Sequence, residues 1–259
     1  MPRFAANLSM LFTEAPFLER FDRAAAAGFK AVEVQFPYEA PAATIRERLV
    51  ANGLTMALHN LPAGDWAAGD RGTACNPARQ AEFRAGVGKA IEYATTLGVP
   101  QLNCLAGKPG QGVDEASTRR TFVDNVRFAA AECRKAGLRL LMEPINNYDV
   151  PGFWLNNTGK ALSIIDEAGA DNLLVQYDIY HAQRYEGEIA ATMKQHLAKI
   201  GHIQFADNPG RNEPGTGELN FEFLFAHIDR IGYTGWLGAE YKPASTTEAG
   251  LGWLKRFSA

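Results

Sequence analysis

Short runs typical of β-strands alternate with longer amphipathic stretches from one end of the 259-residue chain to the other. The short runs predict strands at Phe4–Leu8, Ala31–Gln35, Leu54–His59, Gln101–Cys104, Arg139–Glu143, Leu174–Asp178, His202–Phe205 and Trp236–Glu240. The stretches between them predict helices at Pro16–Ala27, Ala42–Asn52, Ala78–Leu97, Asp114–Ala136, Thr158–Ala168, Glu188–Ile200, Phe221–Ile231 and Thr247–Lys255. Strands that alternate with helices pair in parallel through right-handed crossovers, and eight such units in about 250 residues are typical of a closed (β/α)8 barrel.

The ends of the predicted helices and the absence of competing motifs indicate a single barrel domain. Glycine follows the last turn of several predicted helices, as in TLGV and KAGL, where a left-handed residue is needed. The competing fold, an open doubly wound sheet, would carry a glycine-rich phosphate turn after its first strand, and NLSMLFTEAP contains none. No linker-like tract or run of charges interrupts the chain, so we predict one α/β domain over residues 1–259.

The composition is that of an ordinary globular protein and limits its partners. Hydrophobic residues make up 46% of the chain and charged residues 21%, which is sufficient for a large core. A formal net charge of −3 provides no positive field for phosphate backbones, so we expect no nucleic-acid partner. The sequence contains no signal-peptide pattern and no apolar run of about 20 residues, so we expect a cytoplasmic protein without a membrane partner. The sequence leaves the oligomeric state open, and a homo-oligomer is one of the alternatives.

Polar side chains occupy the carboxyl ends of most predicted strands, where barrel enzymes carry their chemistry. These residues are Gln35, His59, Glu143, Asp178, Gln204 and Glu240, with Glu33 one alternation back in the second strand. Three carboxylates that converge on one mouth would repel each other, and a divalent cation would relieve that repulsion. An oxygen-rich ligand set with one amide favours Mg²⁺, with Mn²⁺ as an option, over a structural zinc site. His181 follows in the sequence DIYH and is placed to return over the same mouth.

Cationic residues near the same strand ends are candidates to hold an anionic substrate. Arg211 lies in the turn-rich segment that follows the seventh strand, and it is the leading candidate. Lys108, Lys242 and Arg71 are its rivals. Arg71 belongs to residues 60–77, a long segment without helical pattern that also contains Trp66 and that we expect to form a lid over the site.

At these residues the sequence resembles the hydroxypyruvate isomerases of the xylose-isomerase-like barrel superfamily, over essentially the whole chain. The matching stretches are RFAANLSMLF, LHNLPAGDWAAGDRG, MEPINNYDVPGF, QYDIYHAQRYEGE, HIQFADNPGRNEPGTGE and AEYKPASTTEAGL. The resemblance implies a metal site made of Glu143, Asp178, Gln204 and Glu240, in which Gln204 replaces the histidine of other superfamily members. It further implies that Glu143 and Glu240 form the catalytic acid and base pair. His59, Lys108, His181 and Arg211 are expected to bind the substrate.

The reaction that this resemblance implies interconverts hydroxypyruvate and tartronate semialdehyde, an intramolecular oxidoreduction in glyoxylate metabolism. A proton moves between adjacent carbons through a cis-enediolate, which requires a base and stabilisation of charge on two neighbouring oxygens. A divalent cation, expected to be Mg²⁺, would stabilise that charge as a Lewis acid. The partner is therefore expected to be a small 2-oxo acid.

Four other functions are open at this point. A 2-oxo-tetronate isomerase would run the same chemistry on a substrate one carbon longer, and a ketose 3-epimerase would need room for a hexose. A zinc-dependent AP-site nuclease on the same barrel would need several histidines at strand ends, and only five histidines are present. A non-catalytic sugar-acid binder would keep the pocket without needing two paired glutamates.

Overall fold

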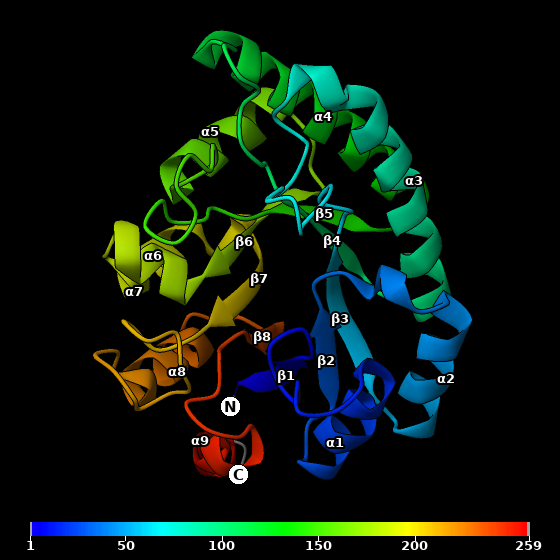
Figure 1. Ribbon diagram of the computed structural model, residues 1–259. Coiled ribbons are helices and arrows are strands. Elements are labelled where there is room, and N and C mark those ends of the chain that lie inside the picture. Colours follow the sequence, from blue (N-terminus) through cyan, green and yellow to red (C-terminus); the bar gives the residue numbers. More distant parts are fainter. Residues whose placement is uncertain (1, 258–259) are drawn as a thin grey trace.

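Eight parallel strands close into a barrel in the computed structural model, which describes residues 2–257 (Figure 1). The strands are β1 (Arg3–Asn7), β2 (Ala31–Val34), β3 (Thr55–Asn60), β4 (Gln101–Cys104), β5 (Arg139–Met142), β6 (Leu173–Asp178), β7 (Ile200–Phe205) and β8 (Trp236–Ala239). They follow one another around the barrel in chain order, and β1 closes it by pairing with β8. Ala5, for example, pairs with Ala31 of β2 on one side and with Gly238 of β8 on the other. The prediction of a single closed (β/α)8 barrel is confirmed.

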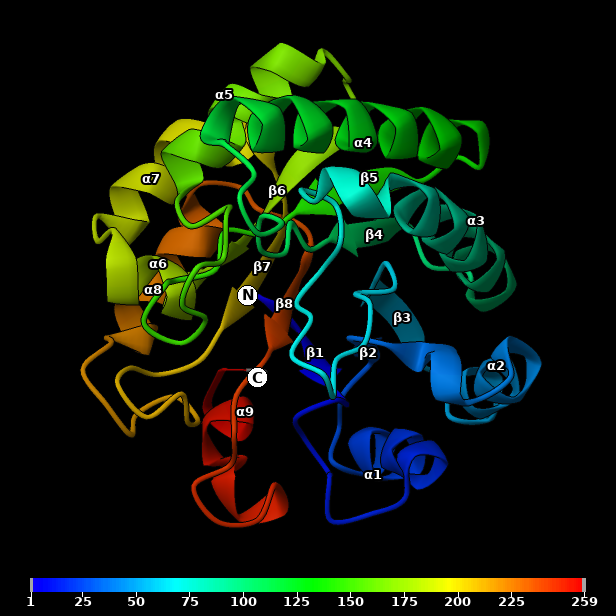
Figure 2. The same ribbon diagram turned by 45° about the horizontal axis from the view of Figure 1, so that its top comes forward.

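Helices follow the strands and lie around the outside of the barrel (Figure 2). They are α1 (Arg20–Ala26), α2 (Ala42–Ala51), α3 (Gln80–Leu97), α4 (Glu115–Lys135), α5 (Thr158–Ala168), α6 (Ile179–Tyr185), α7 (Ile189–His196), α8 (Phe221–Arg230) and α9 (Gly252–Phe257), with short 3-10 turns η1 (Phe17–Glu19), η2 (Pro37–Glu39), η3 (Pro77–Arg79), η4 (Leu197–Lys199) and η5 (Glu248–Gly250). Local chemistry fixes many of their ends. The Asp114 carboxylate accepts a hydrogen bond from the Ser117 amide at the start of α4, and Gly98 ends α3 in a left-handed conformation.

The structure corrects the sequence prediction around β6 and β7. Helix α6 was not predicted, because its seven residues are too few to establish a hydrophobic period. It begins directly after β6, where the Asp178 side chain accepts from the Tyr180 amide at 2.8 Å. The helix predicted up to Ile200 ends at His196, and β7 begins at Ile200. The C-terminal helix starts later than predicted, at Gly252, after the turn η5.

The interior of the barrel changes from apolar to polar along its axis. Ala5, Ala31 and Ala57 form a small apolar layer inside, toward the amino ends of their strands. Asn7 and Glu33, two residues further along β1 and β2, are buried polar residues near the carboxyl ends. A larger apolar core includes Phe4, Phe205, Phe225 and Trp253, whose rings contact one another edge to face. The polar end of the interior is where barrel enzymes carry their sites.

Residues 61–76, all described by the structure, contain no helix or strand and run across the carboxyl end of the barrel. The base of this segment is packed tightly against the loop after β4, since Cys75 donates from its amide to the Ala106 carbonyl at 2.9 Å. Gly72 and Gly107 approach so closely that a methyl group on Gly107 would collide with the Gly72 carbonyl. The base of the segment is therefore fixed to the barrel.

We expect Gly107→Ala to lower the free energy of unfolding by about 2–4 kcal/mol, because the methyl group meets backbone and φ is +84°. Gly69→Ala is the matched control: its φ of +98° carries similar strain, but nothing lies within 4 Å of the added methyl group. It should cost only about 1 kcal/mol. Urea unfolding of both variants measures the difference, and equal losses would contradict the close approach of the two loops.

Among the described residues, we find no helix that combines the length and the apolar character needed to cross a lipid bilayer.

Candidate active site

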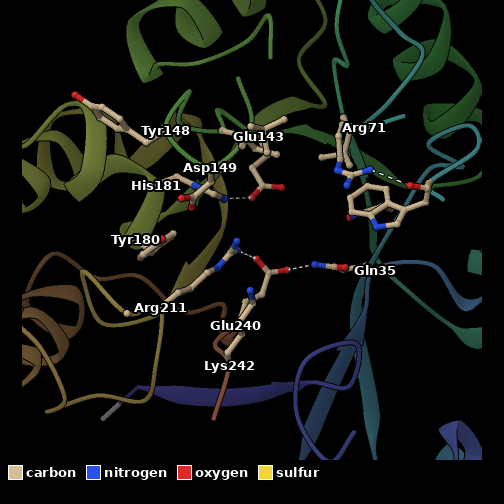
Figure 3. A pocket seen from close by; sticks show the side chains of 16 residues that line it. Gln35, Arg71, Glu143, Tyr148, Asp149, Tyr180, His181, Arg211, Glu240 and Lys242 are labelled. Carbon is tan, nitrogen blue, oxygen red and sulfur yellow. Dashed lines mark hydrogen bonds and ion pairs between the residues drawn. The ribbon is translucent and has the colours of Figure 1, made fainter. Parts of the chain in front are cut away.

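A cavity of about 580 Å³ opens at the carboxyl end of the barrel (Figure 3). Its walls come from strand ends and from the loops that follow them, far apart in the sequence. The lining residues are Gln35, Asn60, Trp66, Arg71, Leu105, Glu143, Ile145, Tyr148, Asp149, Val150, Tyr180, His181, Gly210, Arg211, Glu240 and Lys242. The parallel barrel brings these segments together because all strands end on the same side.

Glu143 directly follows β5 and is buried at the wall of the cavity. Its Oε2 accepts hydrogen bonds from the amide groups of Asn103 and Gln176, both at 2.9 Å. Burial raises the pKa of Glu143 well above its ordinary value, and the nearby charges of Glu240 and Asp178 raise it further. The Arg211 guanidinium and the Asn103 amide oppose this shift, and the net effect favours a proton on Glu143 more than on an exposed glutamate.

Glu240 directly follows β8 and lies in a more cationic environment. Its Oε1 accepts from the side-chain amides of Asn7 and Gln35 at 2.9 Å, and its Oε2 is ion-paired with Arg211 Nη2 at 2.7 Å. Burial raises the pKa of Glu240 above its ordinary value, and the Arg211 guanidinium opposes this rise without cancelling it. The two glutamates therefore face the same cavity with different partners, and the donors around Glu240 favour its ionised form.

Asp178 is the third buried carboxylate of the site, and its two oxygens have different surroundings. Oδ1 caps α6, whereas Oδ2 has no hydrogen-bond partner within residues 2–257. Arg211 Nη2 and His181 Nε2 each lie 3.5 Å from Oδ2. Burial raises the pKa of Asp178 to about 7, against the lowering effect of Arg211.

The raised pKa of Asp178 predicts that stability falls as pH rises. Between about pH 4 and pH 7 the folded protein holds a proton that the unfolded chain has released, so folding loses free energy across this window. We expect Asp178→Asn to be more stable than the wild type by a few kcal/mol at pH 8 and by much less at pH 5. Urea unfolding at both pH values, in the presence of a chelator, measures this. A difference independent of pH would contradict the shifted pKa.

His181 is oriented by Asn146, which the sequence analysis did not single out. The Asn146 carbonyl oxygen accepts from the Asp149 amide at 2.9 Å, so its NH₂ group faces His181 Nδ1 at 2.7 Å. Nδ1 therefore accepts, and the ring proton lies on Nε2. Burial lowers the pKa of His181 well below its ordinary value, so the ring is neutral. A neutral imidazole with a proton on Nε2 can donate a hydrogen bond to an oxygen in the cavity.

A buried hydrogen-bond network connects the two glutamates beneath the cavity. Gln204 accepts from the Gln176 amide at 2.6 Å and donates to Glu33 Oε1 at 2.7 Å. Glu33 also accepts from Asn7 at 2.9 Å, and its Oε2 lies 2.7 Å from His202 Nε2. Because Gln176 also bonds Glu143 and Asn7 also bonds Glu240, the network fixes both glutamates from below.

Of the four side chains expected to bind a metal, Glu143 and Asp178 have oxygen donors close together, whereas Glu240 does not belong to that group among the described residues. The unpartnered Asp178 Oδ2 and the Glu143 carboxylate are oxygen ligands of the type that Mg²⁺ and Mn²⁺ prefer. Donor atoms of Glu143, Asp178 and His181 lie within 4.8 Å of one another. His181 is the weakest of these candidates, since its Nε2 carries the proton. Gln204 Oε1 already accepts one hydrogen bond and retains one lone pair.

Two residues expected to bind the substrate lie outside the cavity lining. The His59 ring packs edge-on against Tyr38, with Nδ1 near the Tyr38 hydroxyl, and burial lowers its pKa to about 4. A register shift between β2 and β3 explains this placement, because an extra residue in β3 reverses the alternation and Asn60 lines the cavity instead. Lys108 is exposed beside Gly152. His181 and Arg211 line the cavity.

The sequence analysis also missed the asparagines of the site. Asn7 and Asn103 lie within short strands and are fully or almost fully buried, and each donates to a glutamate at the cavity. The available signal was a polar residue inside an otherwise apolar strand, which a protein buries only with hydrogen-bond partners.

Residues 21–257 match the family model described as xylose isomerase-like TIM barrel. The chain is 54% identical to the hydroxypyruvate isomerase of Escherichia coli strain K12, over 98% of both chains. It is 51% identical to the 2-oxo-tetronate isomerase of Cupriavidus necator, over 99% of both chains.

Solved structures share the same architecture. A crystal structure titled AP endonuclease, family 2, from Brucella melitensis superimposes with a TM-score of 0.97 at 41% identity, over 99% of both chains. A D-allulose 3-epimerase from Methylomonas superimposes with a TM-score of 0.76 at 22% identity, over 96% of this chain and 87% of that one. The second likeness extends to the fold alone.

Proposed function

Since the chain belongs to the xylose isomerase-like TIM barrel family, we propose that it interconverts hydroxypyruvate and tartronate semialdehyde by proton transfer through an enediolate. It is an enzyme of the isomerase class, and a small 2-oxo acid is its substrate. The observation that carries the proposal is the pair of buried glutamates, Glu143 and Glu240, which come from β5 and β8 and line one cavity.

The reaction moves one hydrogen from C3 to C2 and one proton from the C3 oxygen to the C2 oxygen. A base removes a proton from C3 of hydroxypyruvate, which leaves a double bond between C3 and C2 and negative charge on the C2 oxygen. An acid then delivers a proton to C2, and the proton of the C3 hydroxyl is transferred to the C2 oxygen as the aldehyde forms. Both steps require carboxyl groups near the reacting carbons, and the intermediate requires donors near the two oxygens.

Glu240 is the base in this direction and Glu143 is the acid. The three donors around Glu240, namely Asn7, Gln35 and Arg211, stabilise its charge, whereas burial and the neighbouring acids favour a proton on Glu143. Two carboxyl groups in different environments have different pKa values. One site can therefore supply both an acid and a base at a single pH.

His181 and Arg211 are placed to stabilise the charge that develops on the substrate oxygens. The Nε2 proton of His181 points toward Glu143 and Asp178, where a substrate oxygen would lie. Arg211 is half-buried at the same wall and its guanidinium lies over the Tyr180 ring at 4.9 Å. The loop that carries Arg211 is held by Asp207, whose carboxylate accepts from the backbone amides of Gly215 and Gly217 at 2.9 Å.

A divalent cation, Mg²⁺ or Mn²⁺, would be held by Glu143 and Asp178 together with Gln204 and Glu240. When bound, it would supply Lewis-acid stabilisation of the two substrate oxygens. Arg211 lies between Asp178 and Glu240, 3.5 Å from one and 2.7 Å from the other, so it provides part of the same positive charge.

A second candidate substrate is 2-oxo-tetronate. The cavity of about 580 Å³ is large for a three-carbon acid, and the 51% identical relative carries that name. An AP-site nuclease is less well supported, because the cavity offers a single histidine, His181, among its lining residues.

The deciding experiment compares initial rates on hydroxypyruvate and on 2-oxo-tetronate, each with and without a chelator and with Mg²⁺ added back. We expect the higher kcat/KM on hydroxypyruvate, with tartronate semialdehyde as the product. A higher kcat/KM on the four-carbon acid would select the alternative, and no turnover of either acid would overturn the proposal. An unchanged rate in the presence of a chelator would show that the reaction does not need the cation.

A further inference from the structure

Three cationic side chains line the cavity: Arg71, Arg211 and Lys242. Which of them binds the substrate can be asked only if the proposed function holds. A 2-oxo acid carries a carboxylate that the reaction does not alter. Such a group needs a fixed partner that holds the substrate with its reacting carbons between the two glutamates. Only a cation whose hydrogen bonds are still available can serve as that partner.

Arg211 already has carboxylate partners. Its Nη2 is ion-paired with Glu240 at 2.7 Å and lies 3.5 Å from Asp178, so the guanidinium lies between these two acids. A substrate carboxylate bound to Arg211 would have to displace Glu240 or share a guanidinium already neutralised by two acids. Arg211 therefore serves the reacting end of the site.

Arg71 has a different set of contacts. Its Nη1 donates to the carbonyl oxygens of Trp66 and Asp70, at 3.1 and 2.5 Å, and its guanidinium lies over the Trp66 indole at 3.9 Å. Within residues 2–257 no carboxylate forms an ion pair with Arg71. Its Nε and Nη2 make no hydrogen bond there either, and these two atoms form the edge of the guanidinium that donates two parallel bonds to a carboxylate.

Contacts of Trp66 and Asp70 with neighbouring residues fix the loop around Arg71. Trp66 packs against Phe36 with ring centroids 5.0 Å apart, so the indole under Arg71 is itself supported by the segment after β2. The Asp70 carboxylate forms an ion pair with Arg79 at 2.7 Å and accepts a hydrogen bond from the Asp65 amide at 2.7 Å. Asp70 therefore has its own partners, and the Arg71 guanidinium is held in one plane with the Nε and Nη2 edge unpaired within the described part of the chain.

The position of Arg71 matches this role. In Figure 3 it lies on the opposite side of Glu143 and Glu240 from His181 and Tyr148. Lys242 also lines the cavity, but its side chain is exposed and lies over no aromatic ring of the described residues, so it offers a mobile point charge.

We infer that Arg71 is the residue that binds the carboxylate of the substrate, through Nε and Nη2, and so selects 2-oxo acids over neutral hydroxyketones of the same length. Binding also ties the 61–76 segment to the substrate, because Arg71 and its Trp66 platform belong to that segment.

The test compares Arg71→Gln, Arg71→Lys and the control Lys242→Gln, which removes one positive charge from the same cavity. KM and kcat are measured on hydroxypyruvate, and kcat/KM on 1,3-dihydroxyacetone, in which a hydroxymethyl group replaces the carboxylate. We expect Arg71→Gln to raise the KM for hydroxypyruvate about 10- to 100-fold, with a smaller change in kcat. Arg71→Lys should recover part of this loss, and Lys242→Gln should change KM less than about 3-fold. The value of kcat/KM on dihydroxyacetone should stay within about 2-fold of the wild type.

Each other outcome overturns the assignment. A KM within 2-fold of the wild type in Arg71→Gln would show that another group holds the carboxylate, and an equal rise in Lys242→Gln would show a general charge effect. If the wild type turns over hydroxypyruvate, the proposed function holds even when the variants contradict the role of Arg71. If the wild type turned over no 2-oxo acid, the proposed function would fail and this assignment with it.

Discussion

Replacing Glu143 or Glu240 with glutamine is expected to lower kcat for the isomerisation by about 10³-fold or more, because each substitution removes one member of the proton-transfer pair. The side-chain volume is unchanged, so the fold should persist. Glu132, which lies on α4 and pairs with Lys135 away from the cavity, provides the control, and Glu132→Gln should leave kcat unchanged. Near-native activity in either active-site variant would remove that residue from the pair.

The two glutamates can be told apart by isotope exchange. With hydroxypyruvate in D₂O, Glu143→Gln retains the base, so it should still exchange the C3 hydrogen while it forms no aldehyde. Glu240→Gln lacks the base and should neither exchange nor isomerise. Proton NMR of the substrate reports both results. The reverse pattern would exchange the roles of the two residues, because it would show that Glu143 removes the C3 proton.

Removing the Glu33 side chain is expected to cause the largest loss of stability of any single substitution considered, about 3–5 kcal/mol for Glu33→Ala. Glu33 is fully buried and accepts from Asn7 and Gln204, and it pairs with His202. Without it, these donors lose a buried acceptor. The carboxyl group also fills the space beside Gly238 of β8, where even a methyl group on the glycine would collide with it. The substitution therefore leaves both a cavity and unsatisfied polar groups.

Urea unfolding measures this loss, with Glu39→Ala as the control. Glu39 is the exposed residue of the turn η2, and its removal should change the free energy of unfolding by less than about 0.5 kcal/mol. Glu33→Ala should also lower kcat, since Gln204 and Asn7 lose the partner that orients them. A stability change near that of Glu39→Ala would mean that the network is not maintained by Glu33.

The network around Glu33 shows where sequence reasoning stopped. Glu33 and Gln204 stood out as polar strand residues, yet no pattern indicates that they bond each other across the barrel, 171 positions apart in the chain. His59 shows a different failure. Strict alternation points it at the mouth, and a register shift in β3 turns it toward Tyr38. The partner of a buried polar group is chosen by the neighbouring strands, whose offset local sequence does not encode.

The sequence by itself determined the barrel and the group of acids at its mouth. Strand and helix periods are local, helix ends are fixed by nearby residues such as Asp114 and Gly98, and eight parallel strands leave a single end at which Glu143, Asp178 and Glu240 can meet. Only the tertiary structure decided what each polar group bonds to. It pairs Arg211 with Glu240 and sets the His181 proton toward the cavity, and among residues 2–257 it gives the Nε and Nη2 edge of Arg71 no hydrogen-bond partner. These choices depend on distances of a few ångströms between segments far apart in the chain, and such distances exist only once the barrel has closed.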